Sequence, residues 1–404
     1  MSNKLPQGWK KLSIDDVLID KISGEWGKEC ENENEGVYVL RTTNFTNEGK
    51  LKLDEVVKRN IEEKKVDKKK LQYGDIILEK SGGSENQPVG RVVYFNIESE
   101  DIYLCNNFTQ ILRANPEIIN SKYLLYVLFD IHRKGITEYF QNKTTGIRNL
   151  QTKSYLEQKI NVPPLEEQER IVSILERAED AICKREESNR LLEELVKSRF
   201  IEMFGNPATN PHMWSVSNYE DICRCITDGE HSTPKRCEEG IYLLSARNIH
   251  NHCLKLDNVD FIGEDEYERI SKRIIPQEND ILISCSGSVG RVCKVPKDIK
   301  FQMVRSVAIL KLKENINPTF MEWLIDSNYT QQQILRSINQ SSQANLFQGK
   351  IKKLKAIIPP IELQNEFEAF VNQVYEMKLK IEESLEELKN NFNSLMQRAF
   401  NGEL

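Results

Sequence analysis

Two long stretches of the chain place apolar residues at alternating spacings of three and four. The stretch after residue 360 keeps this pattern with little interruption, and the stretch after residue 164 shows a looser version. Neither contains a proline or a glycine until its end, so we expect two long helices. The residues expected to pair these helices are Ile171, Leu175, Ile182, Leu192, Val196, Phe367, Phe370, Val374, Ile381, Leu388 and Leu395.

Each helix would be ~60 Å long at ~1.5 Å per residue, and a single apolar stripe of that length needs a partner. We expect the partner to be the other helix, in an antiparallel coiled coil with a globular domain at each end of the rod. Ordinary core packing in a helical bundle is the alternative. The length of both stretches and their lack of helix breakers favour the coiled coil.

Short apolar runs separated by polar turns precede each long helix. Pairs of prolines, Pro163-Pro164 and Pro359-Pro360, mark the helix entrances, since proline fits before a helix and not within it. Helical segments are expected at 121–132 and 319–327. The runs rich in Val, Ile and Tyr that we expect to be strands are Val37–Leu40, 75–78, 91–95 and Ile281–Ser284.

The chain also repeats itself with an offset of about 200 residues. The run VYVLRTTN at 37–44 returns as IYLLSARN at 241–248, and VGRV at 89–92 returns at 289–292. The expected fold class is therefore α+β, with two tandem mixed α/β domains, each followed by a long helix. The expected boundaries are a first domain at 1–160, a helix at 161–205, a second domain at 206–355 and a helix at 356–404.

The sequence carries no convincing catalytic signature. No G-x-G-x-x-G follows a predicted strand, and the glycine-rich loop after residue 80 lacks the G-K-[ST] ending of a phosphate-binding loop. Asp75, Glu79 and Lys80 superficially resemble the charged residues of a metal-dependent nuclease. The second copy has Ser284 and Cys285 in place of the latter two, which favours a strand end with a solvated face.

Nine cysteines, an odd number in a chain without a secretory signal, indicate reduced thiols. No apolar run reaches the ~18 residues of a membrane helix, so we expect a cytoplasmic protein. A metal is not expected, because one group of Cys and His has no standard zinc spacing and no counterpart in the first half. That group, which leaves zinc open as an alternative, is Cys223, Cys225, His231, Cys237, His250, His252 and Cys253.

The formal charge of −6 at pH 7 first argues against nucleic acid. Residues 165–204 carry −4 and residues 361–404 carry −5, which leaves +3 on the rest of the chain. The stretch 50–70 alone holds nine Lys and Arg against five Asp and Glu. The acidic balance therefore belongs to the two predicted helices and does not exclude phosphate contacts elsewhere.

Polar loops in both halves carry side chains suited to DNA. Arg suits guanine, Asn and Gln suit adenine, and small residues let the backbone approach phosphate. The alternative is that these are only turn residues. The candidate DNA-binding residues are Arg41, Thr43, Asn44, Lys80, Gln87, Arg91, Lys143, Thr144, Thr145, Arg148, Arg247, Asn248, Ser286, Ser288, Arg291, Arg305, Ser341, Ser342 and Gln343.

At its start, its two helix entrances and its end, the chain resembles the DNA specificity subunits of type I restriction-modification systems. The second entrance has Leu363 where the first has Glu167. The resemblance implies two target-recognition domains that each read one half of a bipartite, asymmetric DNA sequence. The matching pieces are GWKKL at 8–12, INVPPLEEQERI at 160–171, IIPPIELQ at 357–364 and LMQRAFNGEL at 395–404.

The resemblance further implies that the chain has no catalytic site and acts in DNA methylation and phage defence. The helical rod would set the unread gap and bind two methylation subunits, and motor-nuclease restriction subunits would complete the complex on double-stranded DNA. S-adenosylmethionine, ATP and Mg²⁺ would belong to those partner chains. The alternatives are a coiled-coil protein-binding scaffold with no DNA role, and a stand-alone methyltransferase or nuclease.

Overall fold

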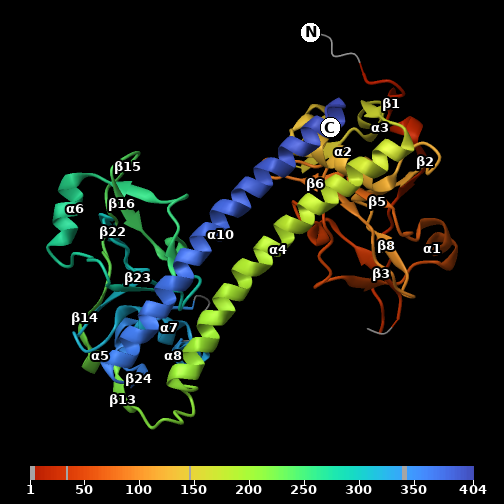
Figure 1. Ribbon diagram of the computed structural model, residues 1–404. Helices are drawn as coiled ribbons and strands as arrows, with labels where there is room; N and C mark the ends of the chain where they lie inside the picture. Colours follow the sequence, from red (N-terminus) through yellow and green to blue (C-terminus); the bar gives the residue numbers. More distant parts are fainter. Residues whose placement is uncertain (1–4, 33–34, 145–146, 339–343) are drawn as a thin grey trace. The chain divides into compact units, whose positions relative to one another are not determined.

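A computed structural model describes residues 5–32, 35–144, 147–338 and 344–404 of the chain (Figure 1). The chain folds into two compact units. Unit 1 comprises Met1–Lys184 and Ser384–Leu404, and unit 2 comprises Arg185–Glu383. Each unit therefore combines one mixed α/β domain with one segment of each long helix.

Within its described residues, unit 1 contains two central sheets and two smaller ones. Its strands are β1 (Lys10–Ser13), β2 (Leu18–Ser23), β3 (Val37–Leu40), β4 (Val57–Arg59), β5 (Ile76–Glu79), β6 (Ser81–Gly83), β7 (Val92–Tyr94), β8 (Tyr103–Cys105), β9 (Thr109–Ala114), β10 (Gln141–Thr144), β11 (Ile147–Leu150) and β12 (Lys159–Val162). The order β2-β9-β5-β7 forms an antiparallel sheet, and β4-β3-β8 forms a mixed one. The smaller sheets are β1-β12 and β10-β11-β6. Its helices are η1 (Asp15–Val17), η2 (Thr42–Asn44), α1 (Glu63–Lys69), α2 (Ser121–Arg133), η3 (Ile136–Phe140) and α3 (Thr152–Leu156).

Unit 2 repeats the central plan. Its strands are β13 (Ser215–Asn218), β14 (Cys223–Asp228), β15 (Arg236–Cys237), β16 (Ile241–Leu244), β17 (Ile249–His250), β18 (Cys253–Leu254), β19 (Asp260–Ile262), β20 (Ile281–Ser284), β21 (Val292–Lys294), β22 (Phe301–Met303), β23 (Val307–Leu312) and β24 (Lys355–Ile358). The orders β14-β23-β20-β21 and β15-β19-β16-β22 match the two central sheets of unit 1, with one added edge strand, β15. Its helices are α5 (Tyr219–Ile222), η4 (Ala246–Asn248), α6 (Glu264–Ser271), α7 (Pro318–Asp326), α8 (Asn328–Ser337) and α9 (Gln348–Ile351).

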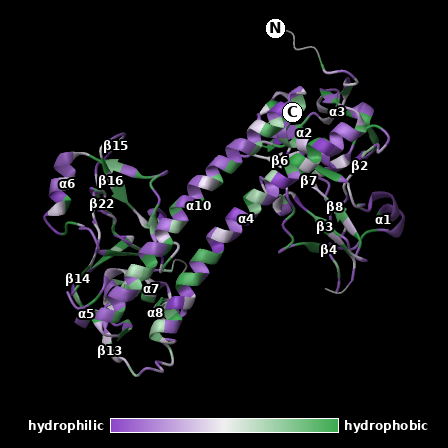
Figure 2. Cartoon of the chain, in the orientation of Figure 1, coloured by the Kyte–Doolittle hydropathy of each residue, from purple (hydrophilic) through white to green (hydrophobic). Residues whose placement is uncertain are grey.

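The central strands are apolar along their whole length because both faces of the sheet are covered. In β5, Ile76 and Leu78 belong to one buried cluster and Ile77 to another. In β20, the same alternation sends Ile281 and Ile283 into one cluster and Leu282 into another. A strand between two cores therefore shows a continuous apolar run in place of alternation. Green, hydrophobic segments are visible among the strands of both units in Figure 2.

The long helices are α4 (Leu165–Phe204) and α10 (Ile361–Asn401). They begin after the proline pairs, later than the expected residues 161 and 356, because the residues before each pair are strands. β12 pairs with β1 and β24 pairs with β13, so the chain start of each domain is held at its helix entrance. Gly205 and Gly402 follow the helix ends with φ of +73°, the left-handed conformation that glycine adopts at low cost.

The two long helices run antiparallel within each unit. In unit 1, Ile171 and Leu175 of α4 share a buried cluster with Met396 and Ala399 of α10, so the start of one helix packs with the end of the other. In unit 2, Lys378 pairs with Glu193 at 2.6 Å and Arg199 with Glu366 at 3.4 Å, so numbers rise along one helix as they fall along the other. The expected antiparallel pairing is thus seen inside both units.

Candidate nucleic-acid interface

In unit 1, three connections between central strands meet. They are residues 41–45 after β3, residues 80–91 between β5 and β7, and residues 106–108 between β8 and β9. The Arg91 guanidinium donates to the carbonyls of Thr42 and Phe45 at 3.1 and 3.2 Å. The Lys80 amide donates to the Phe108 carbonyl at 2.9 Å. These bonds gather the predicted loops of the first domain into one surface, which we call loop cluster 1.

The β10–β11 hairpin joins the same cluster. β11 pairs with β6, placing Arg148 opposite Gly83, and the Ser81 hydroxyl bonds to the Asn149 side chain. Lys143 and Thr144 lie on β10, whereas Thr145 falls outside the described residues. Arg148 pairs with Glu138 at 3.6 Å. The hairpin predicted to touch DNA is therefore tied to the glycine-rich loop.

Asn44 and Asn248 correct the prediction that their amides read bases. Both are buried, with exposures of 2% and 1%. The Asn44 Oδ1 accepts the Arg41 amide at 2.8 Å, and its Nδ2 donates to the Lys52 carbonyl at 3.0 Å. Asn248 forms the same pair of bonds with Ser245 and Lys255. These side chains close the turns after β3 and β16, so they shape the loops from within.

Arg91 and Glu79 also depart from the prediction. Both are buried, and the Arg91 Nε and Nη2 each donate to a Glu79 carboxylate oxygen at 2.9 Å. Glu79 is therefore not part of a solvated strand end. The Arg91 guanidinium is bound to Glu79 inside loop cluster 1. A fork of two parallel bonds to a carboxylate leaves the guanidinium little capacity for another ligand.

The other candidates of loop cluster 1 are more accessible. Thr43 and Gln87 are exposed and line a hollow of about 440 Å³ together with Ser84. Arg41 is half-buried and donates to the Glu55 carbonyl at 3.0 Å. The Lys80 ammonium donates to the Ser23 hydroxyl at 3.1 Å, and burial lowers the pKa of Lys80. Thr43 and Gln87 are thus the side chains freest to meet an incoming ligand.

Unit 2 gathers its corresponding connections in loop cluster 2, which comprises residues 245–248, 285–291 and 304–306. The Ala246 amide donates to the Ser306 hydroxyl at 3.0 Å, and the Cys285 amide to the Ser306 carbonyl at 2.7 Å. Ser286 bridges to Asn345. Five predicted residues of the second half therefore share one surface: Arg247, Ser286, Ser288, Arg291 and Arg305. Ser341, Ser342 and Gln343 lie outside the described residues.

The cations of loop cluster 2 differ in their partners. Exposed Arg247 pairs with Asp260 at 2.8 Å. Arg291 is half-buried and Arg305 is exposed. Among the described residues, neither guanidinium has an ion pair, which leaves both charges available to an anion.

The predicted helix-pairing residues fall into two groups. Ile171, Leu175, Val196, Phe367 and Val374 are buried. The half-buried ones are Ile182, Leu192, Phe370, Ile381, Leu388 and Leu395. The predicted seam omits Phe200, Phe204 and Val371, which are also buried, because it follows one stripe and ignores the face that each helix turns toward its domain.

The sequence-based prediction misses two buried glutamines, one at each helix entrance. They fasten the long helices to the recognition domains. Gln168 Oε1 accepts the Asn120 amide at 2.7 Å, and Gln364 Oε1 accepts the Asn317 amide at 2.9 Å. Each Nε2 also donates at 2.8 Å to the carbonyl of the first proline of its pair. The repeated proline-proline-x-x-x-glutamine spacing could have revealed this clamp, which fastens each long helix to the N-cap of α2 or α7.

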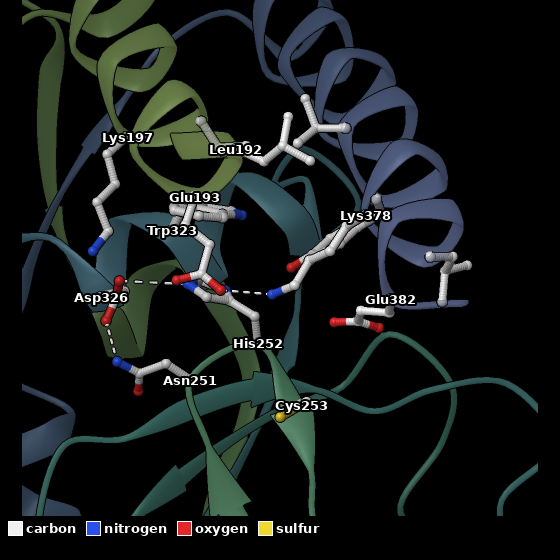
Figure 3. Close-up of a pocket in the computed structure, with 14 residues that line it drawn as sticks. Leu192, Glu193, Lys197, Asn251, His252, Cys253, Trp323, Asp326, Lys378 and Glu382 are labelled. Carbon is white, nitrogen blue, oxygen red and sulfur yellow. Dashed lines mark hydrogen bonds and ion pairs between the residues drawn. The ribbon is translucent and has the colours of Figure 1, made fainter. Parts of the chain in front are cut away.

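A hollow of about 640 Å³ lies in unit 2 beside the β17–β18 hairpin (Figure 3). On one wall, the His252 ring stacks on Trp323 with centroids 3.9 Å apart and pairs with Asp326 at 3.4 Å. Burial lowers the pKa of His252, but the carboxylates of Asp326 and Glu322 outweigh it and raise this pKa to about 9. A protonated His252 therefore fastens the hairpin to α7.

The Cys and His group does not assemble into a metal site within the described ranges, where no three His, Cys, Asp or Glu side chains are placed to hold an ion. All nine cysteines are free thiols. Burial raises the pKa of Cys223 to about 12, which opposes the thiolate form that zinc needs. Over the same ranges, no helix has the length and apolar character to cross a membrane.

Comparison with known proteins places the chain among DNA-specificity proteins. The sequence profile of the type I restriction modification DNA specificity domain matches residues 6–193 and 211–390. The specificity subunit of the type I restriction enzyme EcoKI from Escherichia coli (strain K12) is 22% identical to this chain. The alignment, 434 residues long with its gaps, covers 100% of this chain and 90% of that subunit. The Escherichia coli EcoBI specificity subunit is 25% identical over 246 residues, covering 58% of this chain and about half, 52%, of that relative.

A solved structure extends the likeness to the fold. One chain of a structure described as concerning complex assembly and conformational transition of the type I restriction-modification system aligns over 99% of this chain and 100% of its own length. Its TM-score is 0.60 at 16% identity, so the two share a fold. Since the family profile matches twice and together spans most of the sequence, the chain belongs to the type I restriction-modification DNA specificity family.

Proposed function

We infer that this chain is the DNA sequence-recognition subunit of a type I restriction-modification complex and has no catalytic site of its own. The observation that carries this function is the double occurrence of the specificity domain, one in each half of the chain. Each unit also has its own loop cluster. Two readers with different loop residues require two different half-sites, so the target is bipartite and asymmetric.

We assign the partners from family membership. Two methylation subunits dock along α4 and α10, motor-nuclease restriction subunits complete the assembly, and S-adenosylmethionine, ATP and Mg²⁺ bind those other chains. Exposed apolar side chains on the unit 2 segments of the helices support a protein partner there. They are Leu191, Leu195 and Ile201 on α4 and Leu379 on α10, each 47% to 61% exposed, and exposed apolar side chains that gather on a surface are typical of a protein interface.

Co-expression of this chain with candidate methylation subunits, followed by mapping of methylated adenines across a genome, tests the function. The expected result is one bipartite sequence with two specified halves and a constant unspecified gap. A methylated target without an unspecified gap would contradict the proposed function. Methylation that is unchanged when this chain is omitted would also contradict it. Methyl transfer or DNA cleavage by the purified single chain would also contradict a purely recognitive role.

The helix pair provides a second test, because the separation of two readers sets the spacing of their half-sites. Deleting one heptad from both long helices should change the gap and preserve both half-sites. Deleting it from only one helix should disturb the pairing and reduce methylation. A change in the identity of either half-site after the matched deletion would show that the readers are not independent of the helices.

A further inference from the structure

The repeated sequence Val-Gly-Arg-Val places one arginine at the same point of both units, directly before β7 and β21. In unit 1 this is Arg91, whose charge is neutralised by the buried Glu79 carboxylate. Its Nη1 and Nη2 also donate to two loop carbonyls. Arg91 is thus an internal support of loop cluster 1.

Unit 2 has Ser284 where unit 1 has Glu79. The Ser284 hydroxyl is buried, donates to the Ser288 carbonyl at 2.5 Å and accepts the Arg291 amide at 2.9 Å. Ser284 therefore binds the backbone of Arg291, whereas Glu79 binds the side chain of Arg91. It leaves the Arg291 guanidinium without an acidic partner within the described part of the chain.

A second cation, Lys255, and the ring of His250 lie near Arg291. His250 is on β17, and exposed Lys255 directly follows β18. Burial lowers the pKa of His250, and the positive charges of Lys255 and Arg291 lower it further, so both charges lie close to an imidazole that is itself neutral at pH 7. The hairpin is held beside Arg291 because the His252 amide donates to the Val292 carbonyl at 2.9 Å.

We propose that Arg291, supported by Lys255, binds a backbone phosphate of DNA in the second recognition domain, whereas Arg91 has a structural role in the first. This assignment rests on the proposed function. Neighbouring cations repel one another, and an anion relieves that repulsion where the neutral edge of a base does not. Arginine also matches phosphate geometry through two parallel hydrogen bonds.

The test measures binding of the full chain, assembled with co-expressed methylation subunits, to a fluorescent pool of random-sequence duplexes across a salt series. A phosphate contact contributes about 0.9 to the slope of log affinity against log salt. Arg291→Gln should therefore lower that slope by about 1 and weaken binding about five- to tenfold at ~0.1 M salt. Arg291→Lys should retain most of the slope, and Lys255→Gln should lower it in the same direction.

Arg224→Gln is the matched control. Arg224 is exposed and paired with Glu314 at 2.8 Å. It lies on β14 beside Leu312, the last residue of β23, whereas residues 304–306 of loop cluster 2 precede the first residue of that strand. The substitution makes the same change in net charge and should leave the slope unchanged.

The proposal is overturned if Arg291→Gln and Lys255→Gln bind with the wild-type slope. It is also overturned if Arg291→Gln relaxes one base of the methylated sequence at an unchanged slope, since Arg291 would then read a base. Absence of duplex binding by the wild-type assembly would instead refute the proposed function. The exposed Lys255 variant decides the matter should Arg291→Gln prove unstable.

Discussion

The two units keep one sheet order but stabilise their loops with different chemistry. Unit 1 uses the buried Arg91–Glu79 ion pair, whereas unit 2 uses the Ser284 hydroxyl. At the tip of the hairpin beside the long helices, unit 1 has Gly49 and unit 2 has His252, both at positive φ. The strand framework therefore fixes where the loops lie, and the supporting side chains can change without changing that framework.

The largest expected effect separates the two arginines. Arg91→Gln leaves the Glu79 carboxylate buried without its cation, and breaking a buried pair in this way costs about 3–5 kcal/mol. We expect the free energy of unfolding, measured by urea denaturation, to fall by that amount. Arg291→Gln should change it by less than about 0.5 kcal/mol, because a half-exposed unpaired cation is lost.

A second substitution sharpens this comparison. Glu79→Ser copies unit 2 and removes the stranded carboxylate, so the double variant Glu79→Ser/Arg91→Gln should recover part of the lost stability. A double variant as unstable as the sum of its single changes would show that the two side chains do not act as a pair.

Much of the framework follows from sequence pattern, because apolar period and proline position reflect local physics. The limits of α2 are expected at 121 and 132 and lie at Ser121 and Arg133. Pairing across the fold does not follow from pattern. Glu79 and Arg91 lie twelve residues apart in sequence, and only the antiparallel neighbours β5 and β7 bring them together. The same limit applies to Asn44, since nothing in its residue type distinguishes an amide facing DNA from one closing a turn.

The glutamine clamps give the next largest effect. With partners in the described part of the chain, Gln168 makes three bonds, to the Asn120 amide and to the carbonyls of Ile118 and Pro163. Gln168→Leu should lower the free energy of unfolding by about 2–4 kcal/mol, because these buried backbone groups lose their partners. Gln364→Leu should cost less, since Gln364 bonds only one amide and one carbonyl among the described residues.

Hydrogen exchange at the first turns of α2 and α7 provides the readout. Each substitution should speed exchange at the helix in its own unit and leave the other unit unaffected. Equal losses of stability from both variants would show that the additional Ile118 bond contributes little.

His252 should make unit 2 sensitive to pH in a way that unit 1 is not. Its pKa is raised to about 9, above its unfolded value of about 6.5. The stabilisation is therefore complete below pH ~6.5 and is lost as pH rises through about 9. His252→Gly, which copies Gly49, should remove about 2 kcal/mol at low pH, after allowance for the relief of the positive φ.

Urea denaturation from pH ~6 to ~9.5 tests this expectation through the difference between wild type and His252→Gly. The pH-dependent part of that difference should vanish at the alkaline end, which leaves the constant effects of the lost Trp323 stacking and the relieved positive φ. Glu322 and Asp326 face the His252 ring from α7, and Tyr375 lies nearby on α10. Asp326→Asn should therefore reduce the same pH dependence, and a constant difference across the range would rule out the ion-pair fastening.

The smallest effect concerns the turn asparagines, where the two units agree. Asn44→Ala and Asn248→Ala should each lower the free energy of unfolding by about 1–2 kcal/mol, through loss of bonds that close a turn. Asn248 should be the more costly, because it also donates to the Asn258 carbonyl at 3.2 Å. Mapping of methylated adenines should return unchanged half-sites for both variants. A base position relaxed in one half-site would show that the amide reads DNA after all, and the loops would then have to open on binding to expose a side chain that the free chain buries.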